Sequence, residues 1–507
     1  MSGILGEFAY INWSMLIKIV KEIRDHKFIY LLLFLILIGA TFVRVYNTRN
    51  ILGFYYDQGR DALVIWNFLH KGDIFLVGPT TGLQGVLLGP LFYLIITPFY
   101  FLGGGNPVWP ANFLAILTVI SIIVVYVFSL EFFNRYAGLI TAGIVGFSYY
   151  LIVAARWLAN PTPIFLTSVI LLYSLAKIVK KKESAWWVVA VLMIGFSLQF
   201  EAASAVFYLP AFAIFIAWQR KKLPSRRILV ASVFVFILTL APQIIFEIKN
   251  NFVITRAILR TLFEEKSFRL SFWEVLAARL SFYWKMFFIK IWIANIRQFW
   301  AFSLGVLAIV ILNFRELWAN KTFRILILFG VSPLIGFILF QGNEGNVFDY
   351  YFSGFYLIYI LLFAIGLSYL VKSKFGMIFL VLFFVLFFQM QIPAVKKYLV
   401  VGRSNVSLKE QLAAIDWVYK DADGRAFNVD VYVPPIIPYA YDYLFKWQAL
   451  AYGYEPSGDR EDLLYTLYEK DGGSKFFREW ISRQEGIGKL EEETVFRGLV
   501  VQRRNRI

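Results

Sequence analysis

Apolar runs of about 17 to 22 residues recur along most of this chain, and they constrain its fold more than any other feature of the sequence. A run of that length matches the hydrocarbon core of a bilayer. In a chain of 507 residues, 59% of them hydrophobic, the repeated runs predict an α-helical polytopic membrane protein. The candidate runs lie at about 28–46, 87–102, 109–130, 136–154, 161–178, 186–218, 228–247, 299–313, 325–341, 354–371 and 375–392.

The net charge of +17 does not indicate a nucleic-acid-binding protein. Lys and Arg cluster between the apolar runs, which is where the positive-inside rule puts the cytoplasmic loops of a membrane protein. The remaining positive charge suits anionic lipid head groups. The chain has no cysteine and two histidines, His26 and His70, which excludes disulfides, Fe–S clusters, thiolate zinc sites and His-rich metal sites.

The positions of the basic clusters also predict how often the chain crosses the membrane. They fall on the cytoplasmic side if 87–102 only dips into the outer leaflet and 186–218 forms a pair of short helices. Gly89, Pro90 and Pro98 fit such an interrupted segment. This arrangement predicts about 11 crossings of a multi-pass protein in the plasma membrane.

Three regions follow from this topology. Residues 1–27 are a basic cytoplasmic segment at the interface, and 28–392 are a transmembrane domain whose long outer loops are 48–108 and 248–298. The second of these loops has the pattern of an amphipathic interfacial helix. The apolar runs then stop, and residues 393–507 are expected to form a small outer soluble α/β domain. We expect its helices at 408–419 and 473–483, and strands at 426–433 and 498–502.

The polar stretch Tyr55 to Ala62 follows the first apolar run and carries the strongest candidates for catalysis. Asp57 and Asp61 are four residues apart and would share one face of a helix. A solvated turn beside the membrane is the simpler interpretation. A carboxylate that deprotonates an acceptor hydroxyl is the functional one. We therefore take Asp57 and Asp61 as candidate catalytic residues.

Other polar residues are expected on the same outer face. Charged groups within membrane proteins are costly and tend to mark function, and arginine forks bind phosphate oxygens well. Each candidate also has a structural alternative, such as a helix cap for Asn160, an ion pair for Glu201 and an interfacial belt for Tyr350. The candidates for substrate binding are Arg60, Arg156, Asn160, Gln199, Glu201, Arg256, Arg260, Asn343, Glu344, Asp349 and Tyr350.

Over about 28–392 the sequence resembles the membrane glycosyltransferases of the C-type fold, in particular the family of protein O-mannosyltransferases and lipid A aminoarabinose transferases. The resemblance rests on the order of four motifs that share one face. The family usually has His or Lys before Pro-Pro where this chain has Leu87-Leu88-Gly89-Pro90, and often Asp at the position of Asn160 and Lys near that of Glu201. The four motifs are Tyr56-Asp57-Gln58-Gly59-Arg60-Asp61, Gly89-Pro90-Leu91-Phe92-Tyr93 with Phe101-Leu102-Gly103, Ala155-Arg156-Trp157-Leu158-Ala159-Asn160-Pro161, and Ser197-Leu198-Gln199-Phe200-Glu201.

The resemblance implies the transfer of one sugar from a polyprenyl-phosphate donor to an acceptor on the outer face, with inversion at the anomeric carbon. It implies that Asp57 is the general base or positions the acceptor. Arg156, or Arg256 and Arg260, would neutralise the leaving polyprenyl phosphate. The implied partners are the lipid donor, membrane lipid and a protein, lipid or glycan acceptor.

Two alternatives of other classes remain at this stage. A flippase for a polyprenyl-linked sugar predicts symmetry between two halves of the chain, and loop 48–108 has no counterpart in the second half. The second alternative is a non-catalytic scaffold protein, which would act through its outer domain, residues 393–507. A ligase or polymerase of whole glycans is a variant of the transferase. No cofactor is indicated: Asp57, Asp61, Glu201 and Asp349 would suit a divalent metal, but their spacing does not require one, and we expect none.

Overall fold

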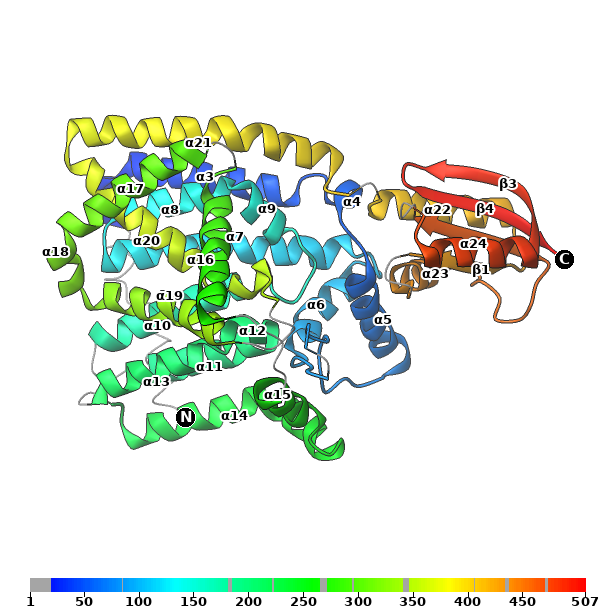
Figure 1. Cartoon of the computed structure of the whole chain (residues 1–507), viewed down its shortest axis with the longest axis horizontal. Helices are drawn as coiled ribbons and strands as arrows, with labels where there is room; N and C mark the ends of the chain where they lie inside the picture. The colour runs from blue at the N-terminus through cyan, green and yellow to red at the C-terminus, as the bar shows by residue number, and fades with distance from the viewer. Residues whose placement is uncertain are drawn as a thin grey trace.

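The computed structural model is a bundle of helices with a small domain that contains a β-sheet at one end (Figure 1). The bundle is built from helices that are long and apolar, as the sequence predicts, which makes the chain a mostly helical polytopic membrane protein. We call the end of the bundle that carries the C-terminal domain the domain end. The structure describes residues 20–83, 85–180, 185–220, 223–264, 271–293, 296–340, 346–404, 406–433, 437–469 and 473–507.

Among these residues, five helices are long and apolar enough to cross a membrane, and a bent pair adds a sixth candidate. The expected number of about 11 crossings depends on shorter apolar helices as well and stays a prediction. The five are α3 (Lys27–Val45), α7 (Val108–Phe132), α14 (Arg226–Lys249), α19 (Lys321–Leu339) and α21 (Lys374–Val401). The other helices of the bundle are α10 (Ile164–Lys180), α17 (Ile296–Leu312), α18 (Phe314–Ala319) and α20 (Tyr356–Ser368), which the 3-10 turn η4 (Tyr369–Lys372) extends.

The predicted span at 136–154 is a bent pair of helices, because the chain turns by 71° between α8 (Arg135–Phe147) and α9 (Tyr149–Ala155). Hydrogen bonds from neighbouring helices hold this break. The hydroxyl of buried Ser148 donates to the Lys290 carbonyl at 2.6 Å, and Gln391 of α21 accepts from the Tyr149 N–H at 2.8 Å. Such contacts replace the intrahelical bonds that a bend removes.

Two further short elements follow the expected pattern. Helix α6 (Leu91–Leu102) has 12 residues and so is about 18 Å long, too short for a hydrocarbon core of about 30 Å. The segment 186–218 is a pair of helices, α11 (Trp186–Phe200) and α13 (Tyr208–Trp218), with Glu201 and the four-residue α12 (Ala202–Ala205) between them.

The segment 248–298 differs from the single interfacial helix that the sequence suggests. Its first helix, α15 (Val253–Phe263), is amphipathic and rests on the loop after α5 through Ile254 and Ala257. Its second helix, α16 (Phe272–Ile291), packs against α19 and α20 and runs across the other helices (Figure 1). It buries Lys290, which the sequence analysis did not consider.

The C-terminal domain begins later than expected. Helix α21 continues through Pro393 to Val401, so the boundary lies near Gly402 rather than at 393. The sheet has the order β1-β2-β4-β3, in which β1 pairs with β2 in parallel and the other pairs are antiparallel. Its elements are α22 (Leu408–Ala422), β1 (Asn428–Tyr432), α23 (Tyr439–Tyr452), β2 (Leu463–Glu469), α24 (Lys475–Ile487), β3 (Gly488–Phe496) and β4 (Leu499–Arg506).

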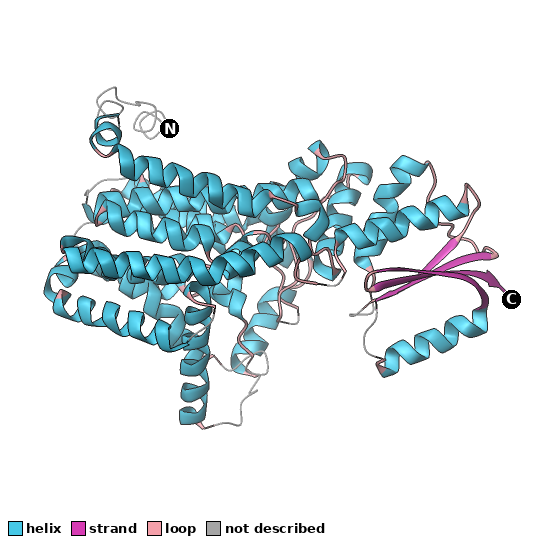
Figure 2. Cartoon of the chain, turned by 90° about the horizontal axis from the view of Figure 1, so that it is seen from above, coloured by secondary structure: helices cyan, strands magenta, loops and turns pink. Residues whose placement is uncertain are grey.

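Helices cover both faces of this sheet (Figure 2). Alternate residues of β2 point to opposite faces. Tyr465 packs against Trp417 of α22, whereas Tyr468 packs against Trp480 of α24. The four helices and strands predicted in this domain are therefore all present, within a few residues of their expected bounds.

The domain packs directly on the stretch that holds Asp57. Helix α5 (Tyr56–Lys71) lies along α23, and Gly59 touches the backbone of Ala440 so closely that any side chain there would collide. Backbone bonds fix the same contact: the Leu408 N–H donates to the Leu52 carbonyl at 2.9 Å. One hydrophobic core joins both parts, with Phe54, Trp66 and Tyr100 around Tyr443.

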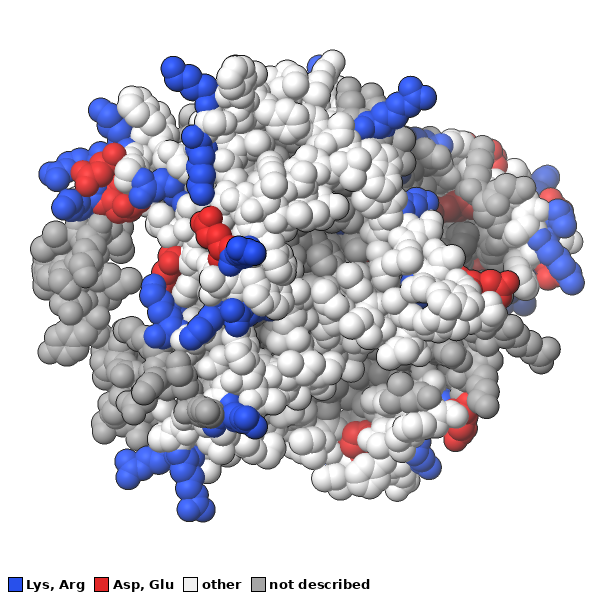
Figure 3. All heavy atoms as spheres, turned by 60° about the vertical axis from the view of Figure 1, so that its left-hand side comes forward, with Lys and Arg blue, Asp and Glu red and all other residues white. Residues whose placement is uncertain are grey.

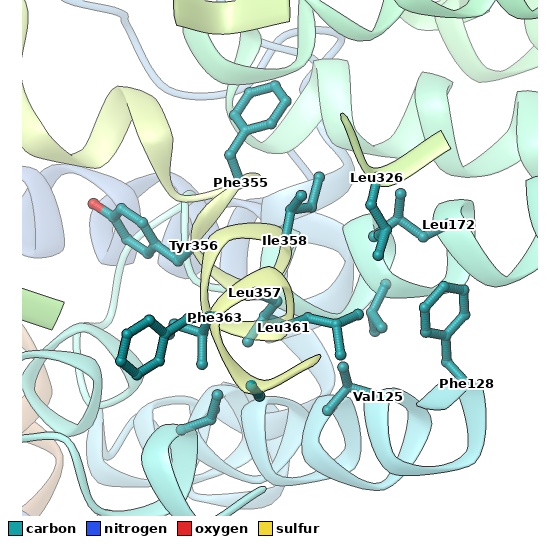
Figure 4. Packing of buried hydrophobic residues seen from close by; sticks show 14 of the residues in the cluster. Val125, Phe128, Leu172, Leu326, Phe355, Tyr356, Leu357, Ile358, Leu361 and Phe363 are labelled. Atoms are coloured by element: carbon teal, nitrogen blue, oxygen red, sulfur yellow. The ribbon is translucent and has the colours of Figure 1, made fainter. Parts of the chain in front are cut away.

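The opposite end of the bundle carries basic side chains around an apolar surface (Figure 3). Arg135 pairs there with Glu22 at 3.3 Å, and Lys177 pairs with Glu131 at 2.7 Å. Between the two ends, α20 lies in the middle of the apolar core and packs against α8, α10 and α19 (Figure 4).

Replacing Gly59 with alanine tests the contact between α5 and α23. We expect Gly59→Ala to lower the melting temperature of the purified protein by several degrees, because the added methyl group forces two backbones apart. The control is Gly486→Ala in α24, where nothing lies near the added methyl group and alanine favours the helix. An unchanged melting temperature for Gly59→Ala would contradict the close contact.

Candidate active site

Asp57 lies in the first turn of α5, with its side chain 57% exposed at the domain end. A carboxylate in this position is stabilised by the partial positive charge of the helix N-terminus. Arg60, one turn further along, places Nη1 3.0 Å from the Asp57 carboxylate. The first turn is fixed by the Tyr55 N–H, which donates to the side-chain oxygen of Gln58 at 3.1 Å. Asp57 is thus oriented by Arg60 and open to a ligand.

Asp61 occupies a different position from Asp57, although the two share one helix. It is 5% exposed and accepts two hydrogen bonds from Arg60, from Nε at 2.9 Å and from Nη2 at 2.8 Å. The Tyr93 hydroxyl donates to the same oxygen at 3.0 Å. Burial raises the pKa of Asp61 to about 6, although the Arg60 guanidinium works against this rise.

These contacts bear on the prediction that Asp61 is catalytic. A carboxylate enclosed by Arg60 and Tyr93 does not face a substrate. Its contact with Arg60 fixes the guanidinium, whose Nη1 then reaches both Asp57 and the Thr80 hydroxyl, the latter at 2.9 Å. The contacts therefore favour a positioning role for Asp61, and its catalytic role stays a prediction.

The 3-10 turn η3 (Asp349–Phe352) lies beside the loop after α5. The hydroxyl of Tyr351 comes close to Gly82, and the ring of Tyr350 lies 5.9 Å from that of the exposed Trp157. These contacts place η3 beside that loop, and the predicted roles of Asp349 and Tyr350 in substrate binding stay predictions. Asn343 and Glu344 lie outside the described residues.

Glu201 is buried at the break between α11 and α13, next to η3. Two residues predicted to bind substrate hold this break instead. Asn160 donates to the Phe200 carbonyl at 2.7 Å. Gln199 accepts from the Leu91 N–H at 3.1 Å, and its amide donates to the Thr239 carbonyl. Asn160 and Gln199 therefore connect elements of the fold, although Asn160 does so by a bond to α11 and is not the cap of the helix that follows it, which begins at Ile164.

Arg156 is 6% exposed and does not face the candidate site. Its guanidinium donates to the carbonyls of Val43 at 3.0 Å and Tyr46 at 2.9 Å, and it lies over the ring of Tyr398. These carbonyls are at the C-terminal end of α3, where a cation is favoured. The structure therefore gives no support to the prediction that Arg156 neutralises the leaving phosphate.

Arg256 and Arg260 are exposed on α15. This helix covers the loop around Val86 through Ile254 and Ala257, at the side of the domain end. Both arginines therefore lie on the helix that covers this loop. Their predicted role in phosphate binding remains a prediction.

Lys290 is the cation that sequence reasoning missed. Its side chain is 4% exposed and pairs with Asp349 at 2.6 Å. The ammonium also lies 4.5 Å from the ring centre of Tyr356 and 5.6 Å from that of Tyr150, a geometry that stabilises a cation. A single lysine within the apolar run Phe287 to Ile291 was the available signal, because charges in such runs tend to mark function.

Metal binding finds no support in the arrangement of these carboxylates. Among the residues that the structure describes, no three His, Asp or Glu side chains are placed to share a metal ion. Asp57 pairs with Arg60, Asp349 with Lys290, and Glu201 is buried at the break between α11 and α13.

Residues 88–246 match the family model for dolichyl-phosphate-mannose-protein mannosyltransferase. Nearly the whole chain is similar in structure to ArnT from Cupriavidus metallidurans bound to undecaprenyl phosphate. The TM-score is 0.55 at 11% sequence identity over 94% of this chain and 97% of that chain. The apo form of the same protein also has a TM-score of 0.55, at 11% identity over 95% and 98% of the two chains.

The archaeal oligosaccharyltransferase AglB from Archaeoglobus fulgidus, solved in complex with an inhibitory peptide and a dolichol-phosphate, has a TM-score of 0.47 at 13% identity. That match covers 88% of this chain and 70% of AglB. No curated protein sequence matches this chain. The match over residues 88–246, together with the fold shared with ArnT, confirms the resemblance to C-type glycosyltransferases that the sequence motifs predicted.

Replacing Arg156 with lysine separates a structural role from phosphate binding. Lysine keeps the charge but cannot reach both carbonyls of α3, so we expect Arg156→Lys to lower the free energy of unfolding by about 1.5–3 kcal/mol. We expect the KM for the lipid donor to stay unchanged. A large increase in KM without loss of stability, measured by thermal unfolding beside the activity assay, would restore the phosphate-binding role.

Proposed function

We propose that this chain, which is a membrane glycosyltransferase of the polyprenyl-phosphate-sugar-dependent class, moves a single sugar to an acceptor on the outer face of the plasma membrane. The observation that carries the proposal is the exposed carboxylate of Asp57, which Arg60 and Asp61 hold at the domain end. The basic side chains at the opposite end support a cytoplasmic location for that end. The C-terminal domain and Asp57 then lie outside.

Asp57 is proposed to act as the general base. The acceptor hydroxyl attacks the anomeric carbon, Asp57 takes the hydroxyl proton, and the bond from that carbon to the phosphate oxygen breaks. The electron pair of that bond leaves with polyprenyl phosphate, and attack opposite the leaving group inverts the anomeric centre. The exposed carboxylate of Asp57, which Arg60 orients, is placed to accept the proton.

Lys290 is proposed to compensate the charge that develops on the leaving phosphate. Arg156 is occupied by backbone carbonyls, and Arg256 and Arg260 lie on the exposed α15. Lys290 instead reaches the candidate site through Asp349, whose side chain is 46% exposed. A preorganised ammonium in apolar surroundings stabilises a phosphate more strongly than one in water.

The acceptor is proposed to enter from the side of the C-terminal domain. Tyr439 of α23 lies 5.0 Å from the ring of Tyr56, directly beside Asp57. Tyr350 and Trp157 add aromatic surface on the other side. Aromatic faces of this kind suit a sugar or a peptide chain, so a glycan, lipid-linked or protein acceptor fits the proposal.

Replacing Asp57 with asparagine is the direct test of the general base. We expect Asp57→Asn to reduce kcat by at least a hundredfold with little change in donor binding, because the amide cannot accept the proton. The assay follows loss of radiolabelled sugar from polyprenyl phosphate in proteoliposomes. The matched control is Asp73→Asn, an exposed carboxylate beyond the other end of α5. Full transfer by Asp57→Asn would exclude the proposed base.

Replacing Lys290 with methionine tests the phosphate contact. We expect Lys290→Met to reduce kcat/KM by roughly 10- to 100-fold, since a charge-assisted contact of about 1.5–3 kcal/mol is lost. Lys290→Arg should recover part of this activity. Lys285→Met on the exposed side of the same helix is the control and should retain activity. Equal kinetics for both methionine variants would show that Lys290 has no part in the reaction.

A further inference from the structure

Strand β1 forms one edge of the sheet in the C-terminal domain. In the order β1-β2-β4-β3, β2 is its neighbour on one side, and no described strand lies on the other. Alternate residues of a paired strand direct their N–H and C=O groups away from that neighbour. Among the described residues, no backbone group of another element bonds to Val429, Asp430 or Val431. The outer side of β1 therefore offers backbone donors and acceptors to a further strand.

The opposite edge, β3, is protected against a further strand in ways that β1 is not. β3 has an irregular register between Leu490 and Glu492, and it carries three consecutive glutamates at 491–493. Bulges and charged side chains are common protections of an exposed edge. The register of β1 with β2 is regular throughout, and Val429 and Val431 are apolar and half-buried.

The carboxylate of β1 is turned to a face of the sheet and does not protect the edge. Asp430 accepts hydrogen bonds from the indole N–H of Trp480 at 2.9 Å and from the amide of Gln484 at 2.7 Å. Arg483 pairs with it at 2.8 Å. All three residues belong to α24, which covers that face. The charge of Asp430 is thus compensated, and the outer side of β1 stays open.

The C-terminal ends of β1 and β2 lie against the start of α23. Tyr432 ends β1 and pairs in register with Tyr468 of β2. Glu469, the last residue of β2, accepts a hydrogen bond from the Tyr441 hydroxyl at 3.0 Å. Tyr441 belongs to the first turn of α23. The end of the edge is therefore fixed next to the N-terminus of α23.

The start of α23 in turn touches the stretch that holds Asp57. Tyr439, the first residue of α23, places its ring 5.0 Å from that of Tyr56. Gly59 of α5 meets the backbone of Ala440. The free edge of the sheet therefore ends close to the exposed carboxylate of Asp57.

We propose that β1 docks an extended segment of a protein acceptor, which adds to the sheet as a further strand and is thereby led to Asp57. The inference rests on the proposed function, in which Asp57 takes the proton of the acceptor hydroxyl. A peptide backbone repeats N–H and C=O groups at the spacing that the edge offers, which a glycan or a lipid does not. Backbone bonds give such a site affinity without requiring one fixed sequence. The five residues of β1 guide about 17 Å of an acceptor chain.

A second copy of this chain suits the edge less well than an acceptor segment does. In an antiparallel pair of two β1 strands centred on their middle residue, Asp430 of one copy lies directly opposite Asp430 of the other. Like charges in this position destabilise a sheet. A segment of Thr and Val residues brings no such charge and has a high propensity for strands.

Amide hydrogen exchange tests the added strand directly. The full-length protein is held in nanodiscs of phosphatidylglycerol and phosphatidylcholine, and the probe is a synthetic peptide of alternating Thr and Val residues with a lysine at each end. We expect the peptide to slow exchange across 428–432 about tenfold or more, because the outward N–H groups of β1 become bonded. Exchange across 488–496 in β3 should stay unchanged.

Three results of this experiment would overturn the proposal. They are no slowing in β1, equal slowing in β3, and slowing in β1 that needs no peptide but increases with protein concentration. The last result would assign the edge to a second copy of the chain.

A charge on the edge strand tests its part in transfer. We expect Val431→Lys, which gives β1 the kind of side chain that protects natural edges, to raise the KM for the Thr-Val peptide about tenfold or more. The KM for N-acetylthreonine amide, which is too short to form a strand, should stay unchanged. Val495→Lys on the exposed part of β3 is the matched control and should change neither KM. An unchanged peptide KM in a folded Val431→Lys protein would contradict the docking edge.

The half-buried position of Val431 calls for a melting curve of the variant beside the kinetics. Should the variant not fold, the exchange experiment on the wild-type protein decides.

The outcomes separate this inference from the proposed function. Transfer to N-acetylthreonine amide by the wild-type protein, with no protection of β1 by the peptide, would overturn the docking edge and leave the transferase standing. Protection of β1 by the peptide without transfer to either acceptor would support the docking edge and contradict the proposed reaction.

Discussion

The contact between α5 and the C-terminal domain is the interaction on which the candidate site depends. A first-loop segment with an exposed carboxylate would have many conformations at a membrane surface, and ordering it costs conformational entropy. This chain offsets that cost by packing α5 against α23, with Gly59 allowing the two backbones to touch. The hydrophobic core around Tyr443 continues from the loop into the domain. The domain therefore holds Asp57 in place, and it is more than an appendage of the bundle.

Buried charges show a second constraint, because a charge in apolar surroundings needs a partner. The chain meets this need in different ways. Arg44 donates to the carbonyls of Gly146 and Val145 at 2.8 Å each, and Arg156 binds the carbonyls of α3, so both use helix ends as their partners. Asp61 pairs with Arg60.

Lys290 differs from these residues because its partner Asp349 is half exposed. The Lys290 pair is thus open to solvent on the side of Asp349, whereas Arg44 and Arg156 are buried within the bundle. Exposure of the partner thus distinguishes a cation that can serve a substrate from a cation that holds the fold. Counting charges on one face of the membrane, as sequence reasoning must, does not make this distinction.

The sequence predicted much of the architecture because hydrophobic runs and basic clusters report directly on spans. The short α6, the paired helices at 186–218 and the elements of the C-terminal domain all have local signals. The sequence around Ser148 carries no local signal for the break between α8 and α9. Lys290 and Gln391, which hold this break, are distant from it in the sequence. Contacts with distant residues also distinguish Asp61 from Asp57, because Asp61 accepts a hydrogen bond from Tyr93. Asn160 and Gln199 likewise bind carbonyls of segments that are distant in the sequence.

The course of α16 explains why a lysine is found at position 290, although burying its charge costs free energy. Most helices of the bundle present either apolar residues to the bilayer or charges to its edges. Helix α16 instead runs across the bundle, and one of its faces passes from an apolar cavity at Tyr283 and Phe287 to the cation at Lys290. The Asp349 carboxylate and the ring faces of Tyr356 and Tyr150 stabilise that ammonium, so one helix carries both an apolar face and a compensated charge.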